Sequence, residues 1–340
     1  MNIGAVKAHE PPEKSAFTEK GCFAQIALQL WNQRVSAMHR SIQFNLDQAI
    51  ERFVSDGSAI ALGTSLETMI PFAAGHELIR QGKRDLTLIG PISDILFDQI
   101  IGCGCVRKVR AAWVGNVITG SGYNFRRAVE AGNLEVEDHS NLTLAMALKA
   151  GAMGVSFMPT RTALGSDLFQ TNASLKSVAC PFSGETLAAV AAITPDVAIV
   201  HVQRADVYGN AHAWGNLGVT REACLASRHV ILTAEEIVPP EIIRSDPNRV
   251  ITPGFKVDAV VHWPWGAHPS PVPGYYNRDH QMFIDYQDQS RTPEAYFQWR
   301  QNWIEGIETS MDYLERLGRE RALSLALTTH VKSATADFGY

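Results

Sequence analysis

Carboxylates are the side chains of this sequence that best suit covalent or acid–base chemistry, and they occur at three places: Glu137 with Asp138, Glu235 with Glu236, and Glu67. A carboxylate can attack an activated acyl group or act as a general base. Glu137 and Asp138 lie between a predicted strand and a predicted helix, where capping of the helix by an Asp or Ser is the simpler role. Nothing in the sequence marks any of these carboxylates as activated.

Nucleotide and hydrolase motifs are incomplete. The run 102–107 lacks the third glycine of a dinucleotide fingerprint, and 115–121 has the glycine spacing of a phosphate loop without its Lys. The run 154–158 lacks the last glycine of a nucleophile elbow. Cys103 and Cys105 have no second thiol pair, and no two histidines are spaced i,i+4 with a carboxylate between them. We therefore expect no metal site.

Loops rich in Gly, Ser, Thr and Asn follow several predicted strands: 63–68, 90–94, 115–122 and 203–210. Such residues leave backbone N–H groups able to approach an anion or a carbonyl oxygen. Each loop alone fits the ordinary need of a strand–helix turn for flexible residues. Four of them at the carboxyl ends of one parallel sheet favour a ligand cleft.

Short apolar strands alternate with amphipathic helices from residue 45 onward. The pattern predicts strands at 59–63, 86–90, 109–116, 134–137, 197–203, 229–233 and 257–262, and helices at 46–55, 71–81, 93–101, 122–131 and 140–150. This order predicts an α/β fold with an open, mainly parallel sheet and helices on both faces.

The two ends of the chain differ from this pattern. Residues 1–44 predict a helical arm, packed either on the same protomer or on a neighbouring one, and 45–327 predict the α/β domain. Within the domain, 263–280 is a proline-rich wrap, and 292–317 predicts one long helix that Thr292 caps and Gly318 ends. Residues 323–327 suit a last strand, and 328–340 form a tail.

Composition excludes several classes of protein. The 340 residues are 46% apolar, which is enough to bury a core, and the net charge of −5 gives no basic footprint for nucleic acid. No apolar run approaches the ~20 residues of a membrane helix. Residues 1–14 lack the pattern of a signal peptide. Five sparse cysteines indicate reduced thiols and a cytoplasmic location.

Several stretches, taken together and in order, resemble the A-type (α) chain of family I coenzyme A (CoA) transferases such as glutaconate CoA-transferase. They are VDAVV and PWGAHPS at 257–261 and 264–270, EEI and IRSDP at 235–237 and 243–247, GNLEVEDHS at 132–140, FMP at 157–159 and VAIVH at 197–201. The similarity covers almost all of 45–327, and the arm lies outside it.

The resemblance implies a heteromeric enzyme, α2β2 or larger, with the active site between an A-type chain and a homologous B subunit. It implies that the B subunit supplies the glutamate that attacks an acyl-CoA, and that CoA then passes to a carboxylic acid, by ping-pong kinetics. CoA is then a substrate, with no permanently bound cofactor. The lack of an evident nucleophile in this chain agrees with that division of labour.

The role left for this chain is to shape the acyl pocket and to donate hydrogen bonds to the developing oxyanion. The candidate residues are Gly63, Thr64, Ser65, Glu67, Gly90, Asn116, Ser140 and Asn141. The family often has Gly-Gly-Phe after the first strand and a basic residue before the next proline, whereas this chain has Gly63-Thr64-Ser65 and Met69-Ile70. Losing that cation favours an acyl group less polar than glutaconate.

Two other functions stay open. A related branch hydrolyses a ring in steroid CoA esters with a glutamate near the start of the Ser140 helix; the corresponding position is Asn141, which cannot act as a base. A ligand-binding module without enzyme activity would need a DNA-binding element, and the arm at 23–38 is not basic enough for one.

Overall fold

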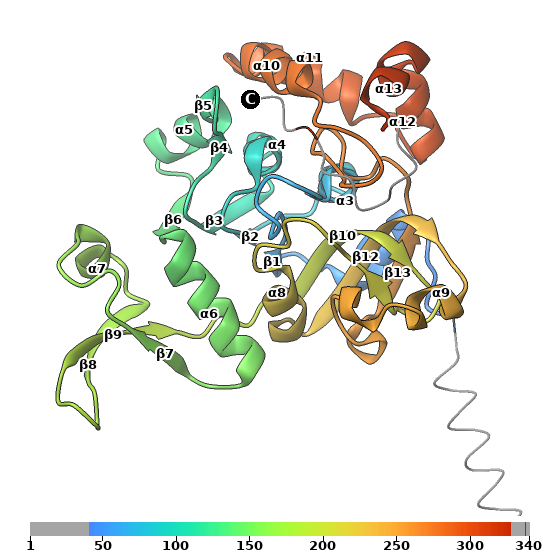
Figure 1. Ribbon diagram of the computed structural model, residues 1–340. Helices are drawn as coiled ribbons and strands as arrows, with labels where there is room; N and C mark the ends of the chain where they lie inside the picture. The colour runs from blue at the N-terminus through green and yellow to red at the C-terminus, as the bar shows by residue number, and fades with distance from the viewer. Residues whose placement is uncertain (1–40, 328–336, 338–340) are drawn as a thin grey trace, which may run out of the picture. The chain divides into compact units, whose positions relative to one another are not determined.

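The computed structural model describes residues 41–327 and Asp337. Seven parallel strands form the central sheet of this part of the chain (Figure 1). Their order is β13-β12-β10-β1-β2-β3-β6, and the short β11 (Ala211–His212) pairs antiparallel with β10. The predicted α/β fold is confirmed. The strands are β1 Ala59–Ala61, β2 Leu86–Ile89, β3 Val106–Ala111, β6 Glu135–Asp138, β10 Val197–Ala205, β12 His229–Ile237 and β13 Ala259–His262.

The order of the strands reverses at β1. From β1 the chain moves outward through β2, β3 and β6, and then returns to the other side of β1 to add β10, β12 and β13. Connections therefore leave β1 and β10 in opposite directions, and open α/β sheets bind ligands beyond the carboxyl ends of the strands at such a point. The loop after β1 lies at this position.

Helices cover both faces of the sheet because successive strand residues point to opposite sides. On one face Ile60, Val197 and Ile199 pack with α2, α3, α4, α10 and α11, and on the other face Ala61 and Ala198 pack with α6 and α8. The bounds are α2 Leu46–Phe53, α3 Phe72–Arg80, α4 Asp94–Gly102, α5 Tyr123–Glu130, α6 Asn141–Met153, α8 Thr220–Ala226, α9 Pro240–Arg244, α10 His280–Gln289 and α11 Pro293–Trp303.

A second sheet, which the sequence did not predict, follows α6. Its antiparallel strands β7 (Phe157–Thr160), β9 (Thr186–Ala191) and β8 (Leu175–Ala179) lie in that order, with the short helix α7 (Asp167–Thr171) between β7 and β8. Figure 1 shows this sheet extending beyond α6. Its strands are short and largely exposed, so they lack the buried apolar runs that identify the central strands.

Three predicted elements are wrong in part. The predicted helix 292–317 is two helices, α11 and α12 (Ser310–Leu317), because Gly306 has a left-handed φ of +71° and Thr309 starts α12 with a capping box. The predicted strand 323–327 lies largely in helix α13 (Arg319–Leu325). The predicted strand 109–116 begins earlier, as β3, and its end forms β4 (Gly115–Asn116), which pairs with β5 (Gly120–Ser121).

The helical arm predicted for 1–44 lies outside the described residues except for 41–44, and Gln43 forms a parallel bridge with Val260 beside β13. The tail predicted for 328–340 lies outside them except for Asp337. The proposed division at 44/45 stays a prediction. In the part of the chain that is described, no helix combines the length and the apolar character needed to cross a membrane.

Gly63→Ala tests the close approach of the loops after β1 and β2. Gly63 has φ +66°, and an added Cβ would lie 2.3 Å from Ser93 Oγ, 2.6 Å from Ser93 Cβ and 3.0 Å from Ser93 Cα, so a rotamer change cannot relieve the contact. Gly57→Ala is the matched control, since Gly57 has φ +80° and open space around it. We expect Gly63→Ala to cost about 1–3 kcal/mol more in the free energy of urea unfolding. Equal losses in the two variants would show that the loops are not tightly packed.

Candidate functional site

The loop after β1 has unused backbone donors. No hydrogen bond joins the N–H of Gly63, Thr64 or Ser65 to another described residue, while the Thr64 carbonyl accepts from Val219 N at 2.9 Å. All three residues are buried and lie at the topological switch point. Buried amides are almost always paired in folded proteins, so a row of unpaired ones at the carboxyl edge of the sheet is suited to hold an anion or an oxyanion.

The hydroxyl groups of this loop have structural partners instead. Thr220, the first residue of α8, bonds through Oγ1 to Thr64 Oγ1 at 3.0 Å and to Ser65 Oγ at 2.7 Å. Thr68 Oγ1 donates to the carbonyl of Asn216 at 2.9 Å. The side chains of Thr64 and Ser65 thus fix the loop against α8. Their main-chain N–H groups remain available to a ligand.

The loops after β2 and β3 join in a buried polar cluster. Asp94, the first residue of α4, accepts from Arg278 Nη2 at 2.8 Å and from Asn116 Nδ2 at 2.8 Å. Asn116 Oδ1 in turn accepts from the N–H of Ile118 and Thr119 at 2.8 and 3.2 Å. Both ends of the Asn116 amide are therefore committed, and its role is to hold the β4–β5 turn.

Burial dominates the electrostatics of this cluster. It raises the pKa of Asp94 to about 6, although the Arg278 charge and the hydrogen bond from Asn116 act in the opposite direction. Asp94 also has a left-handed φ of +49°, which is unfavourable for a residue with a Cβ. The Arg278 side chain is fully buried, and its Nε and Nη1 have no hydrogen-bond partner among the described residues. Strain and incomplete pairing at the same place are typical of functional sites.

Glu67, on the loop after β1, lies next to Arg278 of this cluster. Its Oε2 is 3.7 Å from Arg278 Nη1, its carbonyl accepts from Ser270 Oγ at 2.6 Å, and its side chain is 18% exposed. Leu66 and Met69 on either side have left-handed φ values of +64° and +50°. Glu67 is the candidate carboxylate that reaches the surface at the loop after β1.

The other candidate residues lie farther along the same edge of the sheet. Gly90 is close-packed, because an added Cβ would be 2.5 Å from the carbonyl oxygen of Leu62. Ser140 caps α6 with a capping box that includes Thr143, and Asn141 is exposed beside it. Since β2 and β3 lie between β1 and β6, the start of α6 is three strand spacings, about 14 Å, from the loop after β1.

Glu137 is fully engaged by cations and hydrogen-bond donors. Lys108 Nζ and Arg110 Nε lie 2.8 and 2.9 Å from its Oε2, and His139 Nε2 and Ser174 Oγ lie 3.1 and 2.8 Å from its Oε1. Burial alone would raise its pKa, but the hydrogen bonds from His139, Lys108 and Ser174 and the charge of Arg110 hold it well below the usual range. Such a stabilised carboxylate is a poor nucleophile and a poor base.

Glu235 is likewise occupied. Its Oε1 lies 2.7 Å from His201 Nε2 and accepts from Tyr276 OH at 2.8 Å, while its Oε2 accepts from Trp265 N at 2.9 Å. Its side chain is only 3% exposed. Glu235 therefore fastens the proline-rich wrap to β10 and β12.

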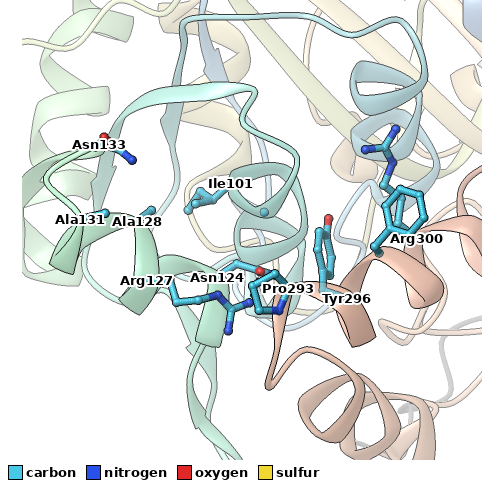
Figure 2. Close-up of a pocket in the computed structure, with 11 residues that line it drawn as sticks. Ile101, Asn124, Arg127, Ala128, Ala131, Asn133, Pro293, Tyr296 and Arg300 are labelled. Carbon is cyan, nitrogen blue, oxygen red and sulfur yellow. Dashed lines mark hydrogen bonds between the residues drawn. The ribbon is translucent and has the colours of Figure 1, made fainter.

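A pocket of about 360 Å³ lies elsewhere, between the end of α4 and helices α5 and α11. Figure 2 shows Ile101, Asn124, Arg127 and Tyr296 among the side chains around it. Arg127 donates to Asn124 Oδ1 and to the carbonyls of Ser290 and Arg291. Because α4 ends at the amino edge of the sheet and these polar groups are paired, we do not assign the functional site here.

Asp94 and Arg278 were not among the candidates from sequence. Asp94 lies in the loop 90–94 that the strand pattern indicates, so its position was visible although its role was not. Arg278 lies in the proline-rich wrap, 184 residues from Asp94, and nothing local in the sequence connects the two.

Arg278→Met tests the buried cluster. Removing the guanidinium leaves the Asp94 carboxylate buried without its cation, which we expect to cost about 3–5 kcal/mol of unfolding free energy. Arg291→Met removes an exposed pair with Asp288 and should cost less than about 1 kcal/mol. Adding Asp94→Asn to Arg278→Met should recover part of the loss. Additive losses in the double variant, measured by urea unfolding, would contradict a coupled pair.

Known proteins similar to this chain support one family. The sequence model of the coenzyme A transferase family matches residues 44–262. The A-type chain of 3-oxoadipate CoA-transferase from Pseudomonas knackmussii is 41% identical over 275 residues, which are 80% of this chain and 96% of that protein. The cholesterol ring-cleaving hydrolase IpdA subunit of Rhodococcus jostii is 29% identical over 285 residues, 79% of this chain and 94% of that protein.

A solved structure agrees with the sequence matches. The glutaconate coenzyme A-transferase of Acidaminococcus fermentans superposes with a TM-score of 0.82 at 32% identity, covering 87% of this chain and 98% of the matched chain. By sequence, the A-type chain of glutaconate CoA-transferase from the same organism is 34% identical over 297 residues, 82% of this chain and 93% of that protein.

Proposed function

The chain belongs to the coenzyme A transferase family as an A-type subunit, and we propose that it works with a homologous B subunit that supplies the nucleophilic glutamate. The complex moves CoA between an acyl-CoA thioester and a carboxylic acid. We further propose an α2β2 or larger assembly in the cytoplasm, with CoA as substrate and no resident cofactor. The four described cysteines form no disulfide, which suits a reducing compartment.

The observation that carries this proposal is the row of unpaired amides at Gly63, Thr64 and Ser65, together with the engagement of Glu137 and Glu235 by neighbouring side chains. When a carboxylate oxygen attacks a thioester carbonyl, the carbonyl oxygen becomes an oxyanion. The oxyanion then collapses as the C–S bond breaks and CoA leaves as a thiolate, giving an acyl anhydride. Fixed N–H donors at that oxygen lower the barrier because they need no reorganisation.

The remaining steps use the same donors. The CoA thiolate attacks the glutamyl carbonyl of the anhydride, the acyl group leaves as a free carboxylate, and a glutamyl-CoA thioester results. An acceptor carboxylate reverses the two steps and leaves with CoA. Glu137 and Glu235 are bound to neighbouring side chains, so in this proposal the attacking oxygen comes from the partner.

Exposed apolar side chains flank the candidate site and suit the partner's contact surface. Trp113, Val117 and Ile118 are 42%, 49% and 46% exposed after β3, and Leu142 is 48% exposed at the start of α6 after the neighbouring strand β6. All lie at the carboxyl edge of the sheet. Apolar groups gathered at one edge are typical of a protein–protein interface.

Co-expression with a homologous B subunit tests the function. We expect CoA transfer only from the complex, and no transfer from this chain alone or from a complex whose B-subunit glutamate is changed to Gln. Hydroxylamine should trap the glutamyl thioester on the B subunit. Full activity of the isolated chain would refute the two-subunit mechanism. Release of a cleaved acid without any acceptor acid would instead favour a hydrolase.

Charged substitutions test the contact surface. Ile118→Asp and Leu142→Asp should each weaken binding of the B subunit by at least tenfold, because a carboxylate would be buried in an apolar contact. Phe255→Asp is the control. Phe255 is 87% exposed and precedes β13, the outer strand on the other side of the sheet from β6. Titration calorimetry gives the dissociation constants. Equal affinity in all three variants would place the partner elsewhere.

A further inference from the structure

Three consecutive residues at the start of α8, Gly218, Val219 and Thr220, hold the loop after β1. Val219 N donates to the Thr64 carbonyl at 2.9 Å. Thr220 Oγ1 lies 3.0 Å from Thr64 Oγ1 and 2.7 Å from Ser65 Oγ. Gly218 permits this close approach, because an added Cβ would lie 2.3 Å from the Thr64 carbonyl oxygen. Residues 64 and 65 are therefore held from one side by the chain that begins α8.

The bond from Val219 sets the direction of the Ser65 amide. The Thr64 carbonyl and the Ser65 N–H belong to one planar trans peptide unit, so they point in opposite directions. Because the carbonyl is directed at Val219, the Ser65 N–H points away from the start of α8. A rotation of this peptide unit would redirect the N–H, so the contacts of its two residues determine where that donor is aimed.

Thr220 is the residue whose side chain bonds both residues of this peptide unit. Thr64 and Ser65 stand at its two ends, and one hydroxyl group joined to both side chains restrains both ends. All three residues are buried. A hydrogen bond lost there is not simply exchanged for one to water, so removal of the Thr220 hydroxyl frees the peptide unit to turn.

Helix α8 gives Thr220 a rigid base. Ala223 and Cys224 of α8 are fully buried, and they pack in one apolar cluster with Leu144 and Leu148 of α6. Close-packed interiors leave little room for displacement. The core of the protein thus fixes the Thr220 hydroxyl, and the support of a catalytic donor by a rigidly held neighbour is what precise positioning requires.

We propose that Thr220 is a positioning residue for acyl transfer, which holds the peptide unit of Thr64 and Ser65 so that the Ser65 N–H donates to the oxyanion. The inference rests on the proposed function and adds a residue to its mechanism. Thr220 acts only through the two side chains that it bonds. Negative charge on the carbonyl oxygen grows from the bound thioester to the tetrahedral intermediate, so a misdirected donor costs more in the transition state than in the bound substrate.

Thr220→Val tests this role in the complex reconstituted with the B subunit. Valine replaces the hydroxyl group of threonine by a methyl group. Butyryl-CoA and glutaryl-CoA are tried as donors with acetate as acceptor, and the faster donor is used. We expect kcat to fall by about tenfold to a hundredfold, with KM for the donor changed by less than about threefold. Thr220→Ser keeps the hydroxyl and should retain kcat within about threefold of the wild type.

Thr252→Val is the matched control, since Thr252 is fully buried and its Oγ1 has no hydrogen-bond partner among the described residues. It should leave kcat unchanged. Rates are expressed per complex isolated by gel filtration, so that a loss of folded chain does not count as a loss of kcat. An unchanged kcat in Thr220→Val, or an equal loss in Thr220→Ser or Thr252→Val, would overturn the role of Thr220.

The same hydrogen bonds can be removed from the loop. The double variant Thr64→Val, Ser65→Ala lacks both partners of Thr220 and should show the same fall in kcat, which gives the same test if Thr220→Val does not assemble. Adding Thr220→Val to it should change kcat by less than about threefold, because the interaction is already lost. A further loss of about tenfold would contradict an action through Thr64 and Ser65. Absence of B-dependent transfer from either donor in the wild-type complex contradicts the proposed function itself.

Discussion

The buried ion pair between Arg278 and Asp94 connects the proline-rich wrap to the sheet, and the arrangement of the candidate site depends on it. Asp94 also accepts a hydrogen bond from Asn116, which holds the β4–β5 turn, and Arg278 Nη1 faces Glu67 on the loop after β1. Burying two charges is costly, and incomplete pairing makes it more so. The raised pKa of Asp94 shows that burial outweighs its partners. An interaction of this kind adds little net stability but specifies one arrangement of three loops that are distant in sequence.

The carboxyl edge of the sheet carries two kinds of polar group: carboxylates with partners and main-chain N–H groups without them. Glu137 joins β3 and β6 to Ser174, which precedes β8 of the antiparallel sheet. Glu235 joins β10 and β12 to the proline-rich wrap. The main chain of Gly63–Ser65, by contrast, offers donors with no partner among the described residues. A chain built in this way can stabilise charge that develops on a ligand but has no obvious group for attack. This agrees with membership of a family in which related proteins are named as subunits.

The sequence predicted the parallel sheet well because its strands are short apolar runs between amphipathic helices. The placement of the candidate site at the carboxyl edge rests on the rule that parallel strands bring their ends together, and it stays a prediction. Local signals were reliable: the Ser140 cap of α6 and the Thr292 cap of α11 both formed. The prediction of one helix over 292–317 was wrong. Ile304 and Ile307 stay buried across the break, so the apolar periodicity continues although the chain turns at Gly306. Arg278 was missed because its contact with Asp94 is purely tertiary.

The donors at the loop after β1 belong to the main chain, and that has a consequence for how such proteins diversify. Nearly every amino acid carries the same amide, so drift in the side chains of this loop leaves its N–H donors in place, provided that the glycine turn survives. A side chain of this loop can therefore be replaced without removing those donors. Under the proposed function, the oxyanion contacts and the side chains that shape the acyl pocket can therefore change independently.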